Sequence, residues 1–112
     1  MKEEFFKYKA IDYRIQIGEN KKDNFDIIDM ANSNDIWFHV EGISSCHVIL
    51  KSDKKIKDIP HQVVKKCAYL CKINSKAKTL PICNISYTTI NNVTKTNVIG
   101  QVTILNYKIV RV

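Results

Sequence analysis

The segment spanning residues 35–50 constrains the fold most strongly, because apolar and polar residues alternate in both of its halves. This period of two is typical of a half-buried β-hairpin, and the glycine and serines between the halves supply a tight turn. Pairing the halves about that turn predicts Trp37 opposite Ile49 and His39 opposite His47. A shift by one residue would bury both histidines, so the pattern itself favours this register.

The predicted hairpin has two unlike faces. The apolar face consists of the even-numbered positions Ile36, Phe38, Val40, Cys46, Val48 and Leu50. The opposite face carries polar and aromatic side chains at Asp35, Trp37, His39, Glu41, Ser45 and His47. We expect the apolar face to lie in the core and the other face to be open and free to bind a ligand.

Two helices are predicted from the spacing of apolar residues. A short one covers residues 25–31, and Asn24 or Asp23 is available to cap its N-terminus. A longer one starts from Asp58 as N-cap and ends near Asn74. The lysines of the longer helix are interleaved with its apolar positions, which predicts one buried and one solvated side.

Strands are predicted at both ends of the chain. Residues 5–17 favour a strand pair or one long bent strand, and residues 83–89 a further strand. Residues 100–105 and 107–112 are predicted to pair with each other around a turn near Asn106. The order of elements predicts one domain of the α+β class over the whole chain. Its largely antiparallel sheet is built around the central hairpin, with the long and the short helix packed on one face.

The composition is that of a globular protein, with 45% hydrophobic and 26% charged residues. No apolar run approaches the roughly 20 residues that a membrane-spanning helix needs. The N-terminus has acids and aromatics where a signal peptide would carry a long aliphatic segment. We therefore expect an intracellular, cytoplasmic protein.

The net charge of +7 is unevenly distributed along the chain. Residues 59–112 contain lysines and an arginine but no aspartate or glutamate, whereas acids outnumber bases in residues 1–50. Such a basic half favours a polyanionic partner, namely RNA, DNA or an acidic membrane surface. The alternative is that these lysines only solvate the surface.

Catalytic and metal-binding patterns are weak. Cys46 and His47 are adjacent, so on a strand they point to opposite faces and cannot form a nucleophile–base pair. Two pairs of potential zinc ligands are present, Cys67 with Cys71 and His39 with His47. Each pair supplies only two ligands, whereas a zinc site needs three or four protein ligands. The chain also lacks a glycine-rich phosphate loop. We expect no enzyme activity, no cofactor and no metal, and a metal-dependent or Cys/His enzyme is the least favoured alternative.

The hairpin resembles a known family. Its two halves, "SNDIWFH" at residues 33–39 and "SSCHV" at residues 44–48, resemble the "D-x-W-[FL]-H … P-G-S-H-V" core of the NFACT-R domain. The form of this core looks closest to a small eukaryotic branch of the family, whose members append a coiled coil to the domain. The sequence of this chain contains the domain but no coiled coil. Weaker matches follow in order at Ile17–Asn20, Asn24, Ile59–Pro60, Ala68, Ser75, Tyr87–Thr88, Lys95 and Gly100–Val102. The chain departs from the pattern where Ser45-Cys46 replaces Gly-Ser and where Lys95 replaces a lysine pair.

The resemblance implies a non-enzymatic nucleic-acid-binding module. Its implied partner is RNA, either transfer RNA or the large ribosomal subunit, in ribosome-associated quality control or another translation-linked process. The alternatives are DNA binding, or a protein-interaction module that docks through the Trp37, His39 and His47 face. We expect a monomer.

The candidate binding residues fall into two groups. The residues carried over from the family motif, or neighbouring it, are Asp35, Trp37, His39, Ser45, His47, Asn20, Asn24 and Lys95. The lysines expected to attract phosphate are Lys51, Lys54, Lys55, Lys57, Lys65, Lys66 and Lys72.

Overall fold

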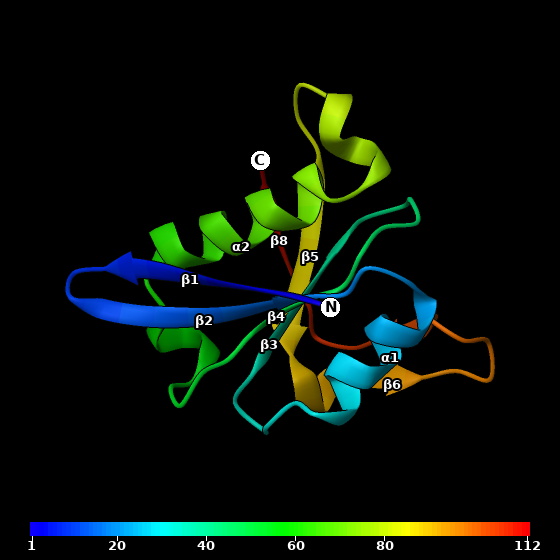
Figure 1. Cartoon of the computed structure of the whole chain (residues 1–112), viewed down its shortest axis with the longest axis horizontal. Helices are drawn as coiled ribbons and strands as arrows, with labels where there is room; N and C mark the ends of the chain where they lie inside the picture. The colour runs from blue at the N-terminus through cyan, green and yellow to red at the C-terminus, as the bar shows by residue number, and fades with distance from the viewer.

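The computed structural model describes all of residues 1–112 and contains a six-stranded antiparallel sheet of order β1-β2-β4-β3-β5-β8 (Figure 1). Its strands are β1 (Lys2–Tyr8), β2 (Ile11–Ile17), β3 (Ile36–Val40), β4 (Val48–Leu50), β5 (Asn84–Thr89) and β8 (Lys108–Arg111). A second, two-stranded sheet pairs β6 (Val93–Lys95) with β7 (Val102–Ile104). The α-helices are α1 (Lys21–Asp29) and α2 (His61–Ile73), and short 3₁₀ turns cover Ile56–Asp58, Lys76–Thr79 and Ile90–Asn92. The predicted α+β class and largely antiparallel sheet are confirmed.

The hairpin register is confirmed. Trp37 pairs with Ile49 and Phe38 with Val48, and β3 lies between β4 and β5 at the centre of the sheet. The connection between β3 and β4 is a loop over residues 41–47, not the expected tight turn. The chain before β4 stays paired on its other side, because the His47 carbonyl accepts a hydrogen bond from the Gly18 amide beside β2.

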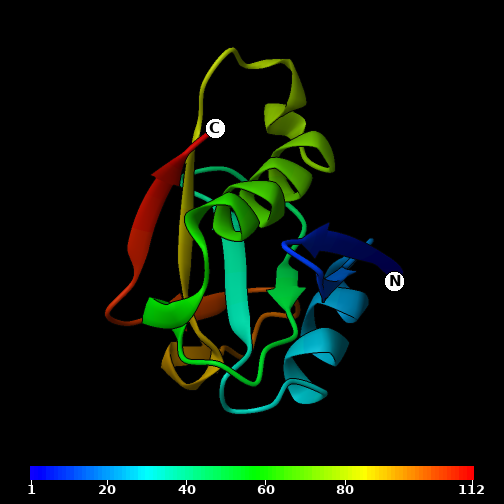
Figure 2. The same ribbon diagram turned by 90° about the vertical axis from the view of Figure 1, so that its left-hand side faces the viewer.

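The sheet is covered on both faces, whereas both helices were expected on one. The α2 side chains Val63, Cys67 and Leu70 join the main core with the even-numbered face of the hairpin. The opposite face contributes Trp37 to a second cluster, which includes Ile27 of α1. Figures 1 and 2 show α2 and α1 on different sides of the central strands. The odd-numbered face is therefore largely covered around Trp37.

Both helices begin at other residues than expected. Helix α1 begins at Lys21, and its N-cap is Asn20, whose side-chain oxygen accepts a hydrogen bond of 2.8 Å from the Asp23 amide. Helix α2 has Pro60 as its N-cap, while Asp58 lies in the preceding 3₁₀ turn. Its end at Asn74 is as predicted. Neither helix has the length and the continuous apolar character that crossing a membrane requires.

The N-terminal strand pair is confirmed, with β1 and β2 in register from Lys2 opposite Ile17 to Tyr8 opposite Ile11. The two turn residues, Lys9 and Ala10, have positive φ angles of 48° and 66°. Such angles are typical of the two-residue turns whose twist matches that of the flanking strands.

The prediction that the last two strands pair with each other is wrong. Strand β7 pairs with β6 in the small sheet, and β8 pairs with β5 at the edge of the main sheet. The hydroxyl of Thr88 contributes to this path, because it donates to the carbonyls of Leu105 and Asn106 at 3.3 Å each. The segment between β7 and β8 is thereby held against β5, and the chain passes from one sheet to the other.

Candidate nucleic-acid interface

Trp37 lies beneath the surface. Its side chain is only 2% exposed and packs among Ile27, Ile49 and Ile90, with β6 and β7 side chains at the edge of this cluster. The expectation that Trp37 stands on an open face is therefore wrong. Alternation along a strand shows which residues share a face, but the second layer that covers this face comes from α1 and the small sheet.

Trp37 forms a compact group with the two histidines. Its indole Nε1–H donates to Nδ1 of His47 at 3.1 Å. The ring of His39 stacks on the indole, with centroids 5.6 Å apart and planes inclined by 2°, and meets the His47 ring edge-on at 5.3 Å. The predicted proximity of the two histidines is confirmed.

The histidines favour their neutral form. Burial, and to a lesser extent the neighbouring His39, lowers the pKa of His47 to about 3. Burial also lowers the pKa of His39. Because Nδ1 of His47 accepts the indole proton, the ring proton of neutral His47 lies on Nε2. The group therefore offers hydrogen-bonding edges and ring faces, and not the positive charge that attracts phosphate.

This titration predicts an acid-sensitive fold. The pKa of His47 is lower in the folded than in the unfolded chain, so the unfolded chain binds more protons and stability falls as pH drops below about 6.5. Between pH 7 and pH 5 we expect the free energy of unfolding to fall by about 2 kcal/mol, measured by urea denaturation. His47→Gln should remove most of this dependence, whereas the same change at exposed His61 should leave it intact. An equally steep dependence in the His47→Gln protein would contradict the assignment.

A cleft of about 630 Å³ opens over this group. Its floor contains Trp37, His39 and His47, together with Ser86 of β5, which pairs with His39. The loop after β3 forms one wall, and the loop between β6 and β7 forms another. Sequence reasoning missed Ser86, Tyr107, Lys21, Val98 and Ile99, while Gly100–Val102 entered only as a weak match to the family pattern. Among the missed residues, Ser86 had a signal, because it alternates with the apolar residues of its strand.

Asp35 acts inside the fold. It is 1% exposed, its carboxylate accepts from the amides of Asn32 and Ser52 at 2.8 Å each, and it forms an ion pair with Lys51. These contacts tie the start of β3 to the loops on either side of the hairpin. Asp35 was a candidate from the family motif and Lys51 a candidate from its charge. The structure pairs these two residues with each other.

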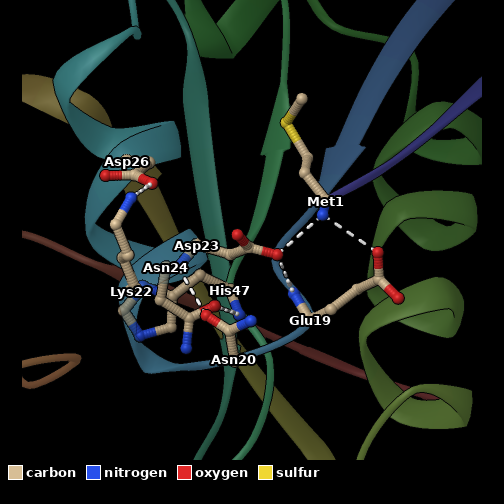
Figure 3. A network of polar contacts seen from close by, with 8 residues as sticks. All are labelled: Met1, Glu19, Asn20, Lys22, Asp23, Asn24, Asp26 and His47. Carbon is tan, nitrogen blue, oxygen red and sulfur yellow. Dashed lines mark hydrogen bonds and ion pairs between the residues drawn. The ribbon is translucent and has the colours of Figure 1, made fainter.

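Asn20 and Asn24 also have partners inside the protein (Figure 3). Asn20 caps α1, and Oδ1 of the buried Asn24 accepts from the His47 amide at 3.0 Å. Gly18 explains the close approach, since a Cβ there would lie 2.2 Å from Asn24 Oδ1. Near these residues, the N-terminal amino group of Met1 bridges Glu19 and Asp23 in the same view.

Ser45 and Cys46 stabilise the loop between β3 and β4. The Ser45 hydroxyl accepts from the Val40 amide at 3.1 Å and donates to the Cys46 carbonyl at 2.9 Å. The thiol of Cys46 points toward α2, where it contacts the Cys71 carbonyl at 3.7 Å. Cys46 and His47 thus face different layers of the molecule, as the strand argument predicts. No three His, Cys, Asp or Glu side chains are grouped so that they could hold a metal ion.

The candidate lysines divide into engaged and exposed ones. Besides Lys51, Lys95 pairs with Asp29, and the buried Lys72 donates to the carbonyls of Pro81 and Val112 at 3.3 Å each. Lys66 is half-buried with its ammonium over the Phe6 ring at 5.8 Å. The exposed members of the set are Lys54, Lys55, Lys57 and Lys65.

The fold and cleft define a small α+β domain whose central strands form the floor of a ligand-sized cleft. The chain belongs to the NFACT protein RNA binding domain family, which it matches over residues 2–105. The family resemblance seen in the hairpin is thus confirmed.

The relatives include proteins from distant eukaryotes. Coiled-coil domain-containing protein 25 of Mus musculus is 42% identical over 87 residues, which cover 75% of this chain and 42% of the relative. Protein JLP2 of Saccharomyces cerevisiae is 37% identical over 89 residues, which cover 74% of this chain and 43% of the relative. The matched segments cover less than half the length of these curated relatives.

A solved structure has a similar fold. The C-terminal part of the fibronectin/fibrinogen-binding protein of Streptococcus suis superposes with a TM-score of 0.85 at 25% identity. The superposition covers 100% of this chain and 45% of the other.

Proposed function

We propose that this chain is a non-enzymatic module that binds RNA. Membership of an RNA-binding domain family supports the choice of ligand. The observation that carries the proposal is the set of exposed lysines in the loop before α2 and on α2, because Lys54, Lys55, Lys57 and Lys65 have no carboxylate partner. Such lysines can follow a phosphate backbone with little loss of internal contacts.

The proposed partner is structured or single-stranded RNA of the translation apparatus, either transfer RNA or ribosomal RNA of the large subunit. The proposed setting is cytoplasmic and linked to ribosome-associated quality control, with the chain acting as a monomer. Protein docking through Trp37 is not proposed, because an anchor residue has to be exposed before binding and Trp37 is buried.

The salt dependence of RNA affinity tests the proposal. We expect the association constant for transfer RNA to fall linearly with salt on a log–log plot, because bound lysines release counterions. Replacing Lys54 and Lys55 by glutamine should lower the slope by roughly 0.7–0.9 for each lost contact, measured by fluorescence anisotropy with labelled RNA.

The control is Lys22→Gln, which removes one positive charge, against two in the double variant, from a lysine already paired with Asp26 on α1. It should leave the slope near that of the unaltered protein. A flat salt response, or equal slopes for all three proteins, would count against an RNA surface at the loop before α2. DNA of the same sequence, included as competitor, measures the preference for RNA.

A further inference from the structure

The floor of the 630 Å³ cleft carries two hydrogen-bonding groups that the protein leaves unused. Ser86 is only 4% exposed, yet its hydroxyl makes no hydrogen bond within the protein. His47 is 2% exposed, its Nδ1 accepts from the indole, and its Nε2–H meets no acceptor within the protein. Neither group is a buried atom without a partner, so both are open to water in the cleft, where a ligand can replace that water.

The floor is flat, aromatic and uncharged at neutral pH. The parallel rings of Trp37 and His39 lie beside the unused hydrogen-bonding groups. The lowered pKa values of His39 and His47 leave no cation on the floor. This chemistry does not suit a phosphate or a carboxylate, but it suits a planar, neutral heteroaromatic ring with donors and acceptors on its edge.

The rim of the cleft carries a positive charge, which the floor lacks. Lys21, the first residue of α1, lines the cleft and has no carboxylate partner. Gly100 brings the loop between β6 and β7 close to this lysine, because a Cβ at Gly100 would lie 3.1 Å from the Lys21 side chain. Exposed apolar residues of the rim, among them Ile99 and Tyr107, offer contact surface next to this positive charge.

We propose that the cleft takes a single unpaired base of a bound RNA strand. The Ser86 hydroxyl and His47 Nε2–H contact the edge of the base, and Lys21 contacts the neighbouring phosphate. The inference rests on the proposed RNA binding and adds the form of RNA that is recognised. Proteins read RNA sequence mainly at such unstacked bases, whose edges and faces are accessible.

The only tryptophan of the chain lies in the floor, so its fluorescence reports on the cleft directly. We expect short single-stranded homopolymeric RNAs to change Trp37 emission on binding, and an RNA duplex of equal length to bind through lysines without this change. The 5′-mononucleotides serve as a further arm. If they change the emission at lower concentration than the single strands do, the cleft is a site for free nucleotides and the assignment to an RNA base is overturned.

A variant tests the same point by affinity. Ser86→Ala should weaken binding of the preferred single strand about fivefold and reduce the differences among the four homopolymers, since one hydrogen bond is lost. Duplex affinity and the salt slope should not change. The control Thr103→Ala removes a hydroxyl from exposed Thr103 of β7, outside the cleft, and should change neither.

The outcomes separate this inference from the broader proposal. Salt-dependent RNA binding with unchanged Trp37 emission, and equal affinities for Ser86→Ala and the unaltered protein, would overturn the cleft assignment and leave RNA binding standing. The absence of binding by any RNA would overturn both. Emission changes confined to single strands, together with the fivefold loss, would support both.

Discussion

Replacing Trp37 by alanine is expected to lower the free energy of unfolding by about 4 kcal/mol, the range found when a large buried aromatic is removed. The indole is almost fully buried in the second cluster, between the central sheet and α1 with the small sheet. Its loss leaves a cavity there and deprives His47 Nδ1 of its donor. Urea denaturation followed by circular dichroism measures the change, because the variant has no tryptophan.

Two further variants make this expectation specific. Trp37→Phe keeps much of the buried area but loses the hydrogen bond to His47, so we expect a smaller loss. Phe5→Ala removes an aromatic that is 68% exposed on β1 and should change stability by less than about 0.5 kcal/mol. A loss for Trp37→Ala no larger than that for Phe5→Ala would contradict the burial of the indole.

The burial of Trp37 also decides how binding should be tested. A protein lacking this indole is expected to be poorly folded, so weaker RNA binding by it would not identify a contact. Ser86 serves better, because its hydroxyl has no partner within the protein. The exposed lysines before α2 serve better for the same reason.

The sequence predicted the centre of the fold well. The alternation of residues 35–50 predicted the hairpin and its register, and the apolar spacing predicted α2 and where it ends. Both patterns are local and are repeated over several residues, so single exceptions do not obscure them. The start of α1 was also within reach, because Asn20 is a residue type favoured at N-caps and Asp23 places an acid in the first turn.

The second layer was beyond local patterns. Strands β6 and β7 have three residues each, too few for a period to show. The cluster around Trp37 combines Ile27 and Ile90 with Val102, which are far apart in the chain. Because a Trp and a His can satisfy each other's polar atoms, a face that looks suited to solvent can be buried. The same holds for Lys72, whose ammonium is satisfied by carbonyl groups.

Asp35→Ala is expected to lower the free energy of unfolding by about 3 kcal/mol. The buried carboxylate satisfies the amides of Asn32 and Ser52 and the ammonium of Lys51, which is largely covered itself. Removing the carboxylate leaves two amides and a partly buried charge without their partner, and such losses exceed the value of the contacts themselves. Chemical denaturation at neutral pH measures the change.

Comparison with a neighbouring acid distinguishes this structural role from a role in binding. Asp53 lies close in sequence but is exposed and makes no ion pair, so Asp53→Ala should change stability by less than about 0.5 kcal/mol. Asp35→Asn keeps an oxygen acceptor and should lose less stability than Asp35→Ala. If Asp35 only stabilises the fold, the Asp35→Asn protein should bind RNA with the affinity of the unaltered protein under conditions in which both are fully folded. Weaker binding by a folded Asp35→Asn protein would instead indicate that this carboxylate takes part in recognition.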